Sequence, residues 1–145
     1  MRSLLSIVLL LLLFLSAGCG AQNSPSRKPL PQAGQSEAQV RTDPALAEKA
    51  KTIEGVEDST ALVLDNQIFI GIKVKGFNRF HLKSIKEKTH KKIKEANQGY
   101  EVNVTSDKKL FSQLQQIEKQ VKENRVESRA DIIERIEKIN KDMQG

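Results

Sequence analysis

Hydrophobic residues recur at every second position in parts of the chain, which predicts β-strands. Residues 67–75 alternate aliphatic with other side chains, and a β-branched and aliphatic run over about 59–64 precedes them. The dipeptide Asp65-Asn66 between the two runs is typical of a tight turn, so the pair is predicted to form a β-hairpin. A third alternating stretch follows at 100–105. The pattern therefore predicts three strands.

Helical spacing of apolar residues appears in two segments around these strands. Asp43, which is followed by a proline, is a suitable N-cap for a first helix that ends before Gly55. A second helix is predicted between Asn78, which can cap it, and Gly99, which can end it. Phe77 could pack against the first turn of that helix as a hydrophobic staple.

The C-terminal part repeats one amphipathic pattern. The apolar residues between Leu110 and Val121 have the same spacing as those between Ile132 and Met143, 22 positions later. Both segments are predicted to be helices. The polar stretch between them leaves open whether they form a helical hairpin or one bent helix.

Together these elements predict an α+β fold with the order α-β-β-α-β, in which helices cover one side of a small three-stranded sheet and C-terminal helices follow. On the uncovered side, Ala61, Val63 and Phe69 would be exposed on the hairpin and would form a candidate partner face. The alternative is that the C-terminal helices cover this face.

The N-terminal segment has the anatomy of an export signal. Its apolar run, residues 4–15, is shorter than the roughly 20 residues that span a bilayer and fits the core of a signal peptide. The letters LSAGC at 15–19 resemble the bacterial lipobox, in which the cysteine receives a diacylglyceryl group, although Ser16 stands where a branched residue is usual. We therefore expect lipidation at Cys19, with simple secretion or an uncleaved anchor as the alternatives.

Cys19 is the one cysteine in the sequence, so a lipidated chain has no thiol for a disulfide or for thiolate chemistry. The residues after it are rich in Pro, Ser, Gln and Gly, which predicts a flexible linker. We expect four parts: a signal peptide at 1–18, a lipidated N-terminus and flexible linker at 19–42, the α-β-β-α-β domain at 43–107 and a C-terminal helical extension at 108–145.

The formal net charge of +6 is concentrated in one segment. From Lys73 to Glu95 there are nine Lys and Arg residues against two acids, a local charge of +7. On a helix these lysines suit contact with anionic lipid, a wall polymer or an acidic partner; the alternative is a solvated polar face. The candidate contact residues are Lys83, Lys86, Lys88, Lys91, Lys92 and Lys94. Nucleic acid is not expected, because a lipid anchor would face away from the cytoplasm.

The sequence offers little for catalysis or metal binding. His81 and His90 are nine residues apart, half a turn around one helix, so they cannot chelate a metal ion together. Glu57 and Asp58 could act as a general acid and base, but charges at the entrance to a strand need no such role. We therefore expect no enzyme activity, no cofactor and no metal.

The segment ALAEKAKTIEGVEDSTALVLDNQIFIGIKV at 45–74 resembles the opening of the sporulation lipoprotein family YhcN/YlaJ, from endospore-forming bacteria. The resemblance covers roughly residues 43–107. It is carried by Ala47, Ala50, Ile53, Gly55, Val56, Val63, Asn66 and Ile70. It implies a role at spore membranes without an established enzymatic activity. The element order is also similar to that of BON and ring-building modules of envelope assemblies, which bind partners.

These observations predict a membrane-anchored sporulation lipoprotein that acts as a non-enzymatic binding or assembly module in spore formation or germination. We expect it on the outer face of the bacterial cytoplasmic membrane, in particular the spore inner membrane, with an envelope protein or a second copy of itself as a possible partner. The alternatives are a ligand-binding lipoprotein of the vegetative envelope, a small envelope hydrolase and a structural component of the coat or cortex.

Overall fold

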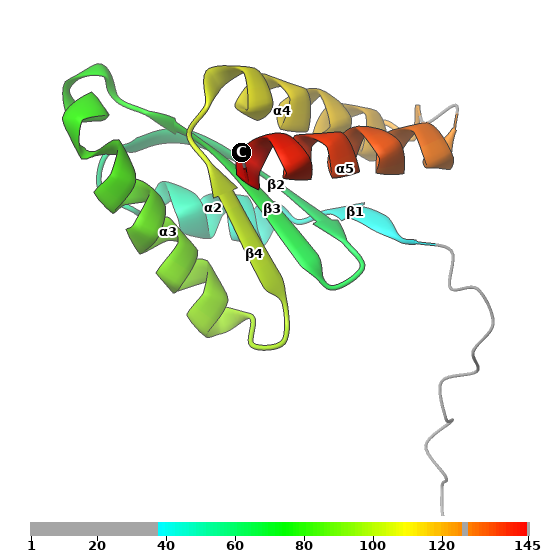
Figure 1. Ribbon diagram of the computed structural model, residues 1–145, viewed down its shortest axis with the longest axis horizontal. Coiled ribbons are helices and arrows are strands. Elements are labelled where there is room, and N and C mark those ends of the chain that lie inside the picture. Colours follow the sequence, from blue (N-terminus) through cyan, green and yellow to red (C-terminus); the bar gives the residue numbers. More distant parts are fainter. Residues whose placement is uncertain (1–37, 126–127, 145) are drawn as a thin grey trace, which may run out of the picture. The chain divides into compact units, whose positions relative to one another are not determined.

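The computed structural model describes residues 38–125 and 128–144. The predicted signal peptide, Cys19 and most of the predicted linker lie outside these residues. Figure 1 shows how the elements are arranged. Their order and bounds are β1 (Val40–Thr42), α2 (Pro44–Lys51), β2 (Val56–Leu64), β3 (Gln67–Val74), the 3₁₀ turn η1 (Gly76–His81), α3 (Leu82–Ala96), β4 (Glu101–Thr105), α4 (Lys108–Lys122) and α5 (Arg129–Gln144).

The strands form one mixed sheet in the order β1-β2-β3-β4. The first three are antiparallel neighbours, whereas β3 and β4 are parallel and are connected through η1 and α3. The predicted hairpin is confirmed, because Leu64 pairs with Gln67 across the predicted turn. The predicted α+β class is also confirmed, but the sheet has four strands rather than three.

The additional strand is β1, which pairs with the last residues of β2. The hairpin turn helps to hold it. The backbone N–H of Gln39 donates to Asp65 Oδ1 (2.9 Å), and the backbone N–H of Asp65 donates to the carbonyl of Gln39 (3.2 Å). Three residues with no periodicity of their own are thus fixed by contacts with a turn far along the chain.

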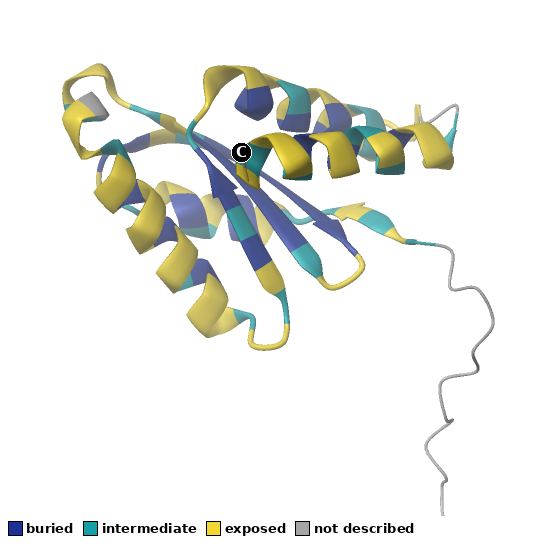
Figure 2. Ribbon diagram, viewed as in Figure 1, coloured by how far each residue is buried: buried dark blue, intermediate teal, exposed yellow. Residues whose placement is uncertain are grey.

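Helices cover both faces of the sheet, and not one face as predicted (Figure 1). The helices α2 and α3 pack on one face, and α4 and α5 pack on the other. As a result β2 and β3 are buried along nearly their whole length, as Figure 2 shows. A strand buried on both sides reads as a nearly continuous apolar run, which explains the composition of residues 59–64.

The predicted partner face on the hairpin is wrong. Ala61 and Val63 point into the core beneath α2 and α3, whereas Phe69 points into the core beneath α4 and α5. None of the three is more than 1% exposed. The reason is that helices cover both faces of the sheet: α2 and α3 cover Ala61 and Val63, and the C-terminal helices, the alternative that the sequence left open, cover Phe69.

The two C-terminal segments are separate helices that contact each other. Asp107 Oδ1 caps α4 by accepting from the backbone N–H of Leu110 (2.9 Å). In α5, Arg135 Nη1 donates to Gln120 Oε1 of α4 at 2.8 Å. The inner sides of both helices, with Leu114 and Ile136 fully buried, share the core of the sheet. Within the described ranges, no helix has the length and the apolar character needed to cross a bilayer.

Candidate functional site

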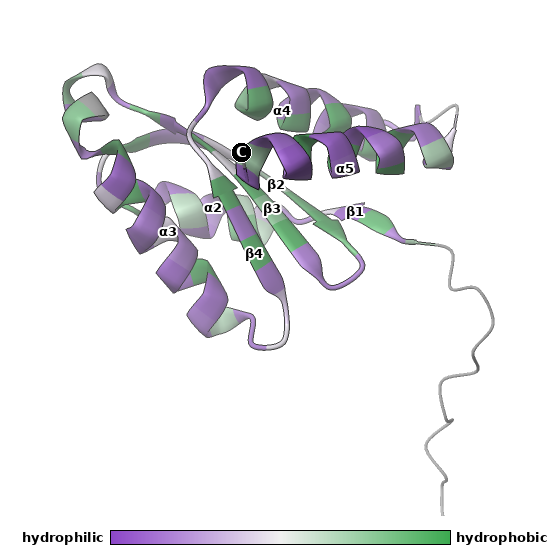
Figure 3. Cartoon of the chain, viewed as in Figure 1, coloured by the Kyte–Doolittle hydropathy of each residue, from purple (hydrophilic) through white to green (hydrophobic). Residues whose placement is uncertain are grey.

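The predicted lysines lie on the outer side of α3. The buried residues of α3 are Ile85, Thr89 and Ile93, which face the sheet. Five of the six lysines are exposed, and Lys92 is half-buried. Figure 3 shows the outer surface of α3 as almost uniformly hydrophilic. The structure therefore brings the six residues together on one helix, and their role as a contact surface stays a prediction.

The lysines in the C-terminal half of α3 form hydrogen bonds or ion pairs with nearby groups of the same chain. Lys91 forms a loose ion pair, 3.9 Å long, with the glutamate one turn further along. Lys92 Nζ donates to Thr52 Oγ1 at 2.6 Å, which joins α3 to the end of α2. Lys94 Nζ donates to the backbone carbonyl of Tyr100. These three lysines thus have partners within the fold.

The N-terminal half of α3 is different. Lys83, Lys86 and Lys88 are exposed, and no group in the described part of the chain forms a hydrogen bond or ion pair with them. Like charges at neighbouring positions of a helix repel each other. An anionic surface would relieve this repulsion, so these three lysines are the strongest part of the predicted contact surface.

The turn η1, which we call the aromatic tip, carries a feature that the sequence did not reveal. Phe77 is 96% exposed and Phe80 is 95% exposed. The predicted staple between Phe77 and α3 does not form. Asn78 does not cap α3 either, because the 3₁₀ turn intervenes and α3 begins only at Leu82. A signal was present: in a 3₁₀ turn residues three apart lie on one face, and the two phenylalanines have this spacing.

The aromatic tip has a firm base. The backbone N–H of Lys75 donates to the carbonyl of Gly55 (3.0 Å), and the backbone N–H of Asn78 donates to the carbonyl of Lys75 (2.8 Å). Gly55 has φ +95°, and a Cβ there would lie 2.7 Å from Ile85 Cδ1 and 3.2 Å from Asn78 Nδ2. A side chain at Gly55 would therefore strain the backbone and would require Ile85 and Asn78 beneath the tip to shift.

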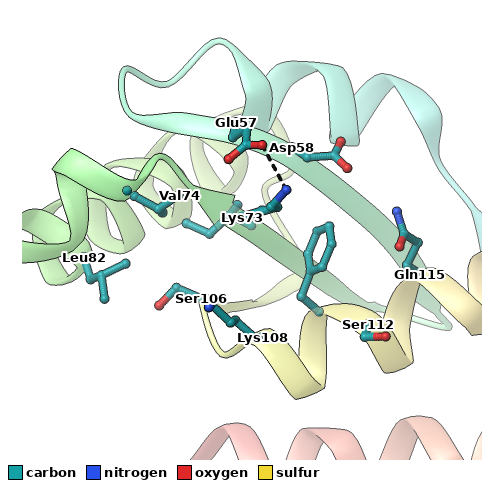
Figure 4. Close-up of a pocket in the computed structure, with 12 residues that line it drawn as sticks. Glu57, Asp58, Lys73, Val74, Leu82, Ser106, Lys108, Ser112 and Gln115 are labelled. Atoms are coloured by element: carbon teal, nitrogen blue, oxygen red, sulfur yellow. Dashed lines mark hydrogen bonds and ion pairs between the residues drawn. The ribbon is translucent and has the colours of Figure 1, made fainter.

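A cleft of about 690 Å³ lies between the sheet and the start of α4 (Figure 4). Ile72, Leu82 and Phe111 contribute apolar surface to it. Glu57 and Lys73 contribute a surface ion pair of 2.9 Å, which Figure 4 marks with a dashed line. The cleft thus combines an apolar interior with charged groups that already neutralise each other.

Each carboxylate of the candidate acid and base pair forms an ion pair with a lysine. The hydrogen bond to Glu57 raises the pKa of Lys73, and the hydrogen bond to Asp58 is the main cause of the raised pKa of Lys51. The two carboxylates are partly exposed and lie in surface ion pairs. This arrangement suits charges at the entrance to a strand, the alternative to a catalytic role.

A family model for the sporulation lipoprotein YhcN/YlaJ matches residues 21–140. The chain belongs to the YhcN/YlaJ family of sporulation lipoproteins. No curated protein matches it. The suspected family is thus confirmed. Lipoproteins are held to membranes by lipid, so an association with the membranes of a spore-forming cell follows from membership.

The YhcN/YlaJ match extends further than the resemblance seen in the sequence. That resemblance stopped near residue 107, whereas the family match includes α4 and most of α5. Packing explains why: Phe69 of the hairpin is buried only because α4 and α5 cover it. The two helices belong to the same core as the segment that first suggested the family.

The histidines of this YhcN/YlaJ protein lie apart from the cleft. His81 ends the aromatic tip and His90 lies on α3; both are exposed, and neither lines the cleft. Among the residues with described positions, no group of three or more His, Cys, Asp or Glu side chains could hold a metal ion. The candidate surfaces are therefore the basic half of α3, the aromatic tip and the cleft.

Proposed function

We propose that this sporulation lipoprotein is a non-enzymatic binding and assembly module for spore formation or germination. Lipid on Cys19 holds it at the outer face of the cytoplasmic membrane, in particular the spore inner membrane. The lysines of α3 then contact an anionic envelope surface. The observation that carries the proposal is a set of exposed lysines that have no hydrogen-bond or ion-pair partner among the described residues: Lys83, Lys86 and Lys88.

The free energy of the lysine contacts suits a domain that lipid already tethers to the membrane. Each lysine close to an anionic membrane contributes about 1 kcal/mol. At physiological salt three of them are too few to recruit a protein from solution, but they are enough to orient one that lipid already holds nearby; at low salt the attraction is stronger. The attraction acts over roughly one Debye length, about 8 Å at physiological salt, and weakens as salt is added.

The anchor is tested by replacing Cys19 with alanine and following the protein by membrane fractionation of sporulating cells. We expect the Cys19→Ala protein to leave the membrane fraction when the membranes are washed with salt. If it fractionates as the unaltered protein does, lipid at Cys19 is not the anchor. Counting heat-resistant spores and following germination of a deletion strain then assigns the stage at which the protein acts.

The lysine surface is tested in the Cys19→Ala background at low salt. Replacing the three lysines named above with glutamate should lower the fraction that remains on the membrane. A matched control places the same three replacements at exposed lysines on the other side of the sheet, Lys119, Lys138 and Lys141. Equal loss in both variants would show that net charge, and not the α3 surface, controls adhesion.

A ligand-binding function is the second candidate, because the cleft of about 690 Å³ has the size and the apolar interior of a small-molecule site. Ser112 is exposed on α4 and lines the cleft, so Ser112→Trp should fill it. If the cleft binds ligands, an uncharged apolar dye should bind the unaltered protein and a Gln98→Trp control but not Ser112→Trp. Equal dye binding by both variants would rule out this function for the cleft.

A further inference from the structure

Phe77 and Phe80 are exceptional among the apolar side chains of this protein. They are the two exposed large hydrophobic residues of the described chain, at 96% and 95%. By contrast Phe69 and Phe111 are buried at 1% and 9% exposure. Exposing two rings on one turn to water is unfavourable, which points to a surface that covers them in the working protein.

The aromatic tip projects from the body of the protein. Figure 1 places the turn at the outer edge of the molecule, beyond the end of β3 and before the first turn of α3. Figure 2 shows it as exposed, and Figure 3 shows green hydrophobic positions on it. Because the turn is of the 3₁₀ type, positions 77 and 80 lie on the same side of it. The two rings therefore have the geometry of one apolar protrusion.

Positive charge lies on both sides of the protrusion along the chain. From Lys75 to Lys86 the sequence contains four Lys and Arg residues and no acid. Lys75 and Lys83 flank the aromatic tip on either side, and both are exposed. Aromatic rings beside cations are typical of segments that enter the boundary between lipid headgroups and acyl chains, where anionic headgroups attract the cations.

We propose that the aromatic tip inserts into an anionic lipid bilayer, with Phe77 and Phe80 at the headgroup boundary and Lys75, Lys83 and Lys86 on the headgroups. The proposal rests on the proposed function, because it names the anionic surface that the lysines contact. The charge pattern favours a bilayer over a protein pocket, because the cations lie on both sides of the rings. Because the base of the tip is already held by packing and backbone hydrogen bonds, insertion costs little conformational entropy of the turn.

The sequence contains no tryptophan, so a single Trp can report on the tip. The full chain is purified from membranes as Phe77→Trp or Phe80→Trp and reconstituted into phosphatidylglycerol vesicles whose acyl chains carry bromine. We expect bromine to quench both tryptophans, and acrylamide in the water to quench them several-fold less than it quenches a tryptophan at position 98 in the same vesicles. Gln98→Trp, exposed at the other end of α3, is the control and should stay accessible to acrylamide.

Three outcomes would overturn the proposal. The tip tryptophans could remain as accessible as the control in anionic vesicles. They could be protected from acrylamide in the vesicles but not quenched by bromine, which identifies a second copy as the occupant. They could be protected in native membranes but not in pure lipid, which identifies a protein partner. In each case the glutamate variants of the lysines still test the α3 surface separately, so a failure of the lipid insertion is distinguishable from a failure of the proposed function.

Discussion

A buried hydrogen bond between the sheet and α4 allows a sharp test of how the C-terminal helices belong to the fold. Thr60 Oγ1 on β2 donates to Glu118 Oε2 on α4 at 2.6 Å. Thr60 is 1% exposed and Glu118 is 8% exposed. The other carboxylate oxygen of Glu118 accepts from Lys122 Nζ at 2.8 Å, one turn along the helix. The carboxylate thus has a partner on each oxygen, and one partner comes from 58 residues away.

Removing either end of this bond leaves the other buried without a partner. Glu118→Leu strands the hydroxyl of Thr60, and Thr60→Val strands one oxygen of Glu118; each costs about 1–3 kcal/mol of unfolding free energy. In the double variant neither group is stranded, so its loss should be smaller than the sum of the single losses. We expect a coupling energy of about 1–3 kcal/mol between the two positions.

The assay is urea unfolding of the full chain followed by circular dichroism. Thr89→Val provides the matched control, because Thr89 is equally buried but bonds to the carbonyl of Ile85 on the opposite face of the sheet. Combined with Glu118→Leu it should be additive within about 0.5 kcal/mol. If Thr60→Val and Glu118→Leu are also additive, the reasoning is refuted and α4 does not depend on this bond.

Three further predictions follow from single features. Gly55→Ala should destabilise the fold by about 1–3 kcal/mol, measured as a lower melting temperature, whereas Gly76→Ala, whose Cβ meets nothing within 4 Å, should not. Asp107→Ala should cost about 1 kcal/mol in urea unfolding through the lost cap, and Asp107→Asn should retain most of it. The bond to Glu57 raises the pKa of Lys73 above its usual 10.5, so this pair stabilises the fold below that pH and ceases to do so as the pH rises through the raised pKa. Lys73→Met should remove this part of the alkaline loss, and an unchanged alkaline profile would contradict it.

The hairpin and the helices were predictable because local chemistry specifies them. Asp65 adopts φ +52° at the turn, a conformation that Asp tolerates better than most residues. Asp43 caps α2 by accepting from the backbone N–H of Leu46, as its place before a proline suggested. In each case one or two neighbouring residues determine the local backbone conformation, so a short stretch of sequence is enough to predict the turn or the start of the helix.

The fourth strand and the second covered face were not predictable in the same way. The strand β1 is three residues long and is held by the hairpin turn, so no window of sequence contains both partners. The second face had a signal that was ambiguous. An apolar run such as 59–64 fits a strand buried on both sides, but it also fits one exposed apolar patch. Only the packing of α4 and α5 against Phe69 decides between them.

The candidate site was likewise predictable only in part. Helical spacing placed the lysines of α3 correctly on its outer side, because a regular helix fixes the direction of every side chain. The sequence does not reveal the aromatic tip because Asn78 is a suitable cap for α3 and Phe77 a suitable staple, which predicts that the helix begins directly after them. A 3₁₀ turn has three residues per turn, and this change of period turns Phe77 away from the helix on which it was expected to pack.

The distribution of charge over the outer helices argues that the lysines of α3 are more than a solvated surface. From Leu82 to Ala96 there are six lysines and two acids, a net charge of +4. From Arg129 to Gln144, on the opposite face, there are four basic and four acidic residues, and the net charge is zero. Solubility requires only mixed charges of both signs, as α5 has. A helix of the same protein with a net charge of +4, next to two exposed phenylalanines, creates a positive field and an apolar protrusion at one site, and an anionic bilayer satisfies both.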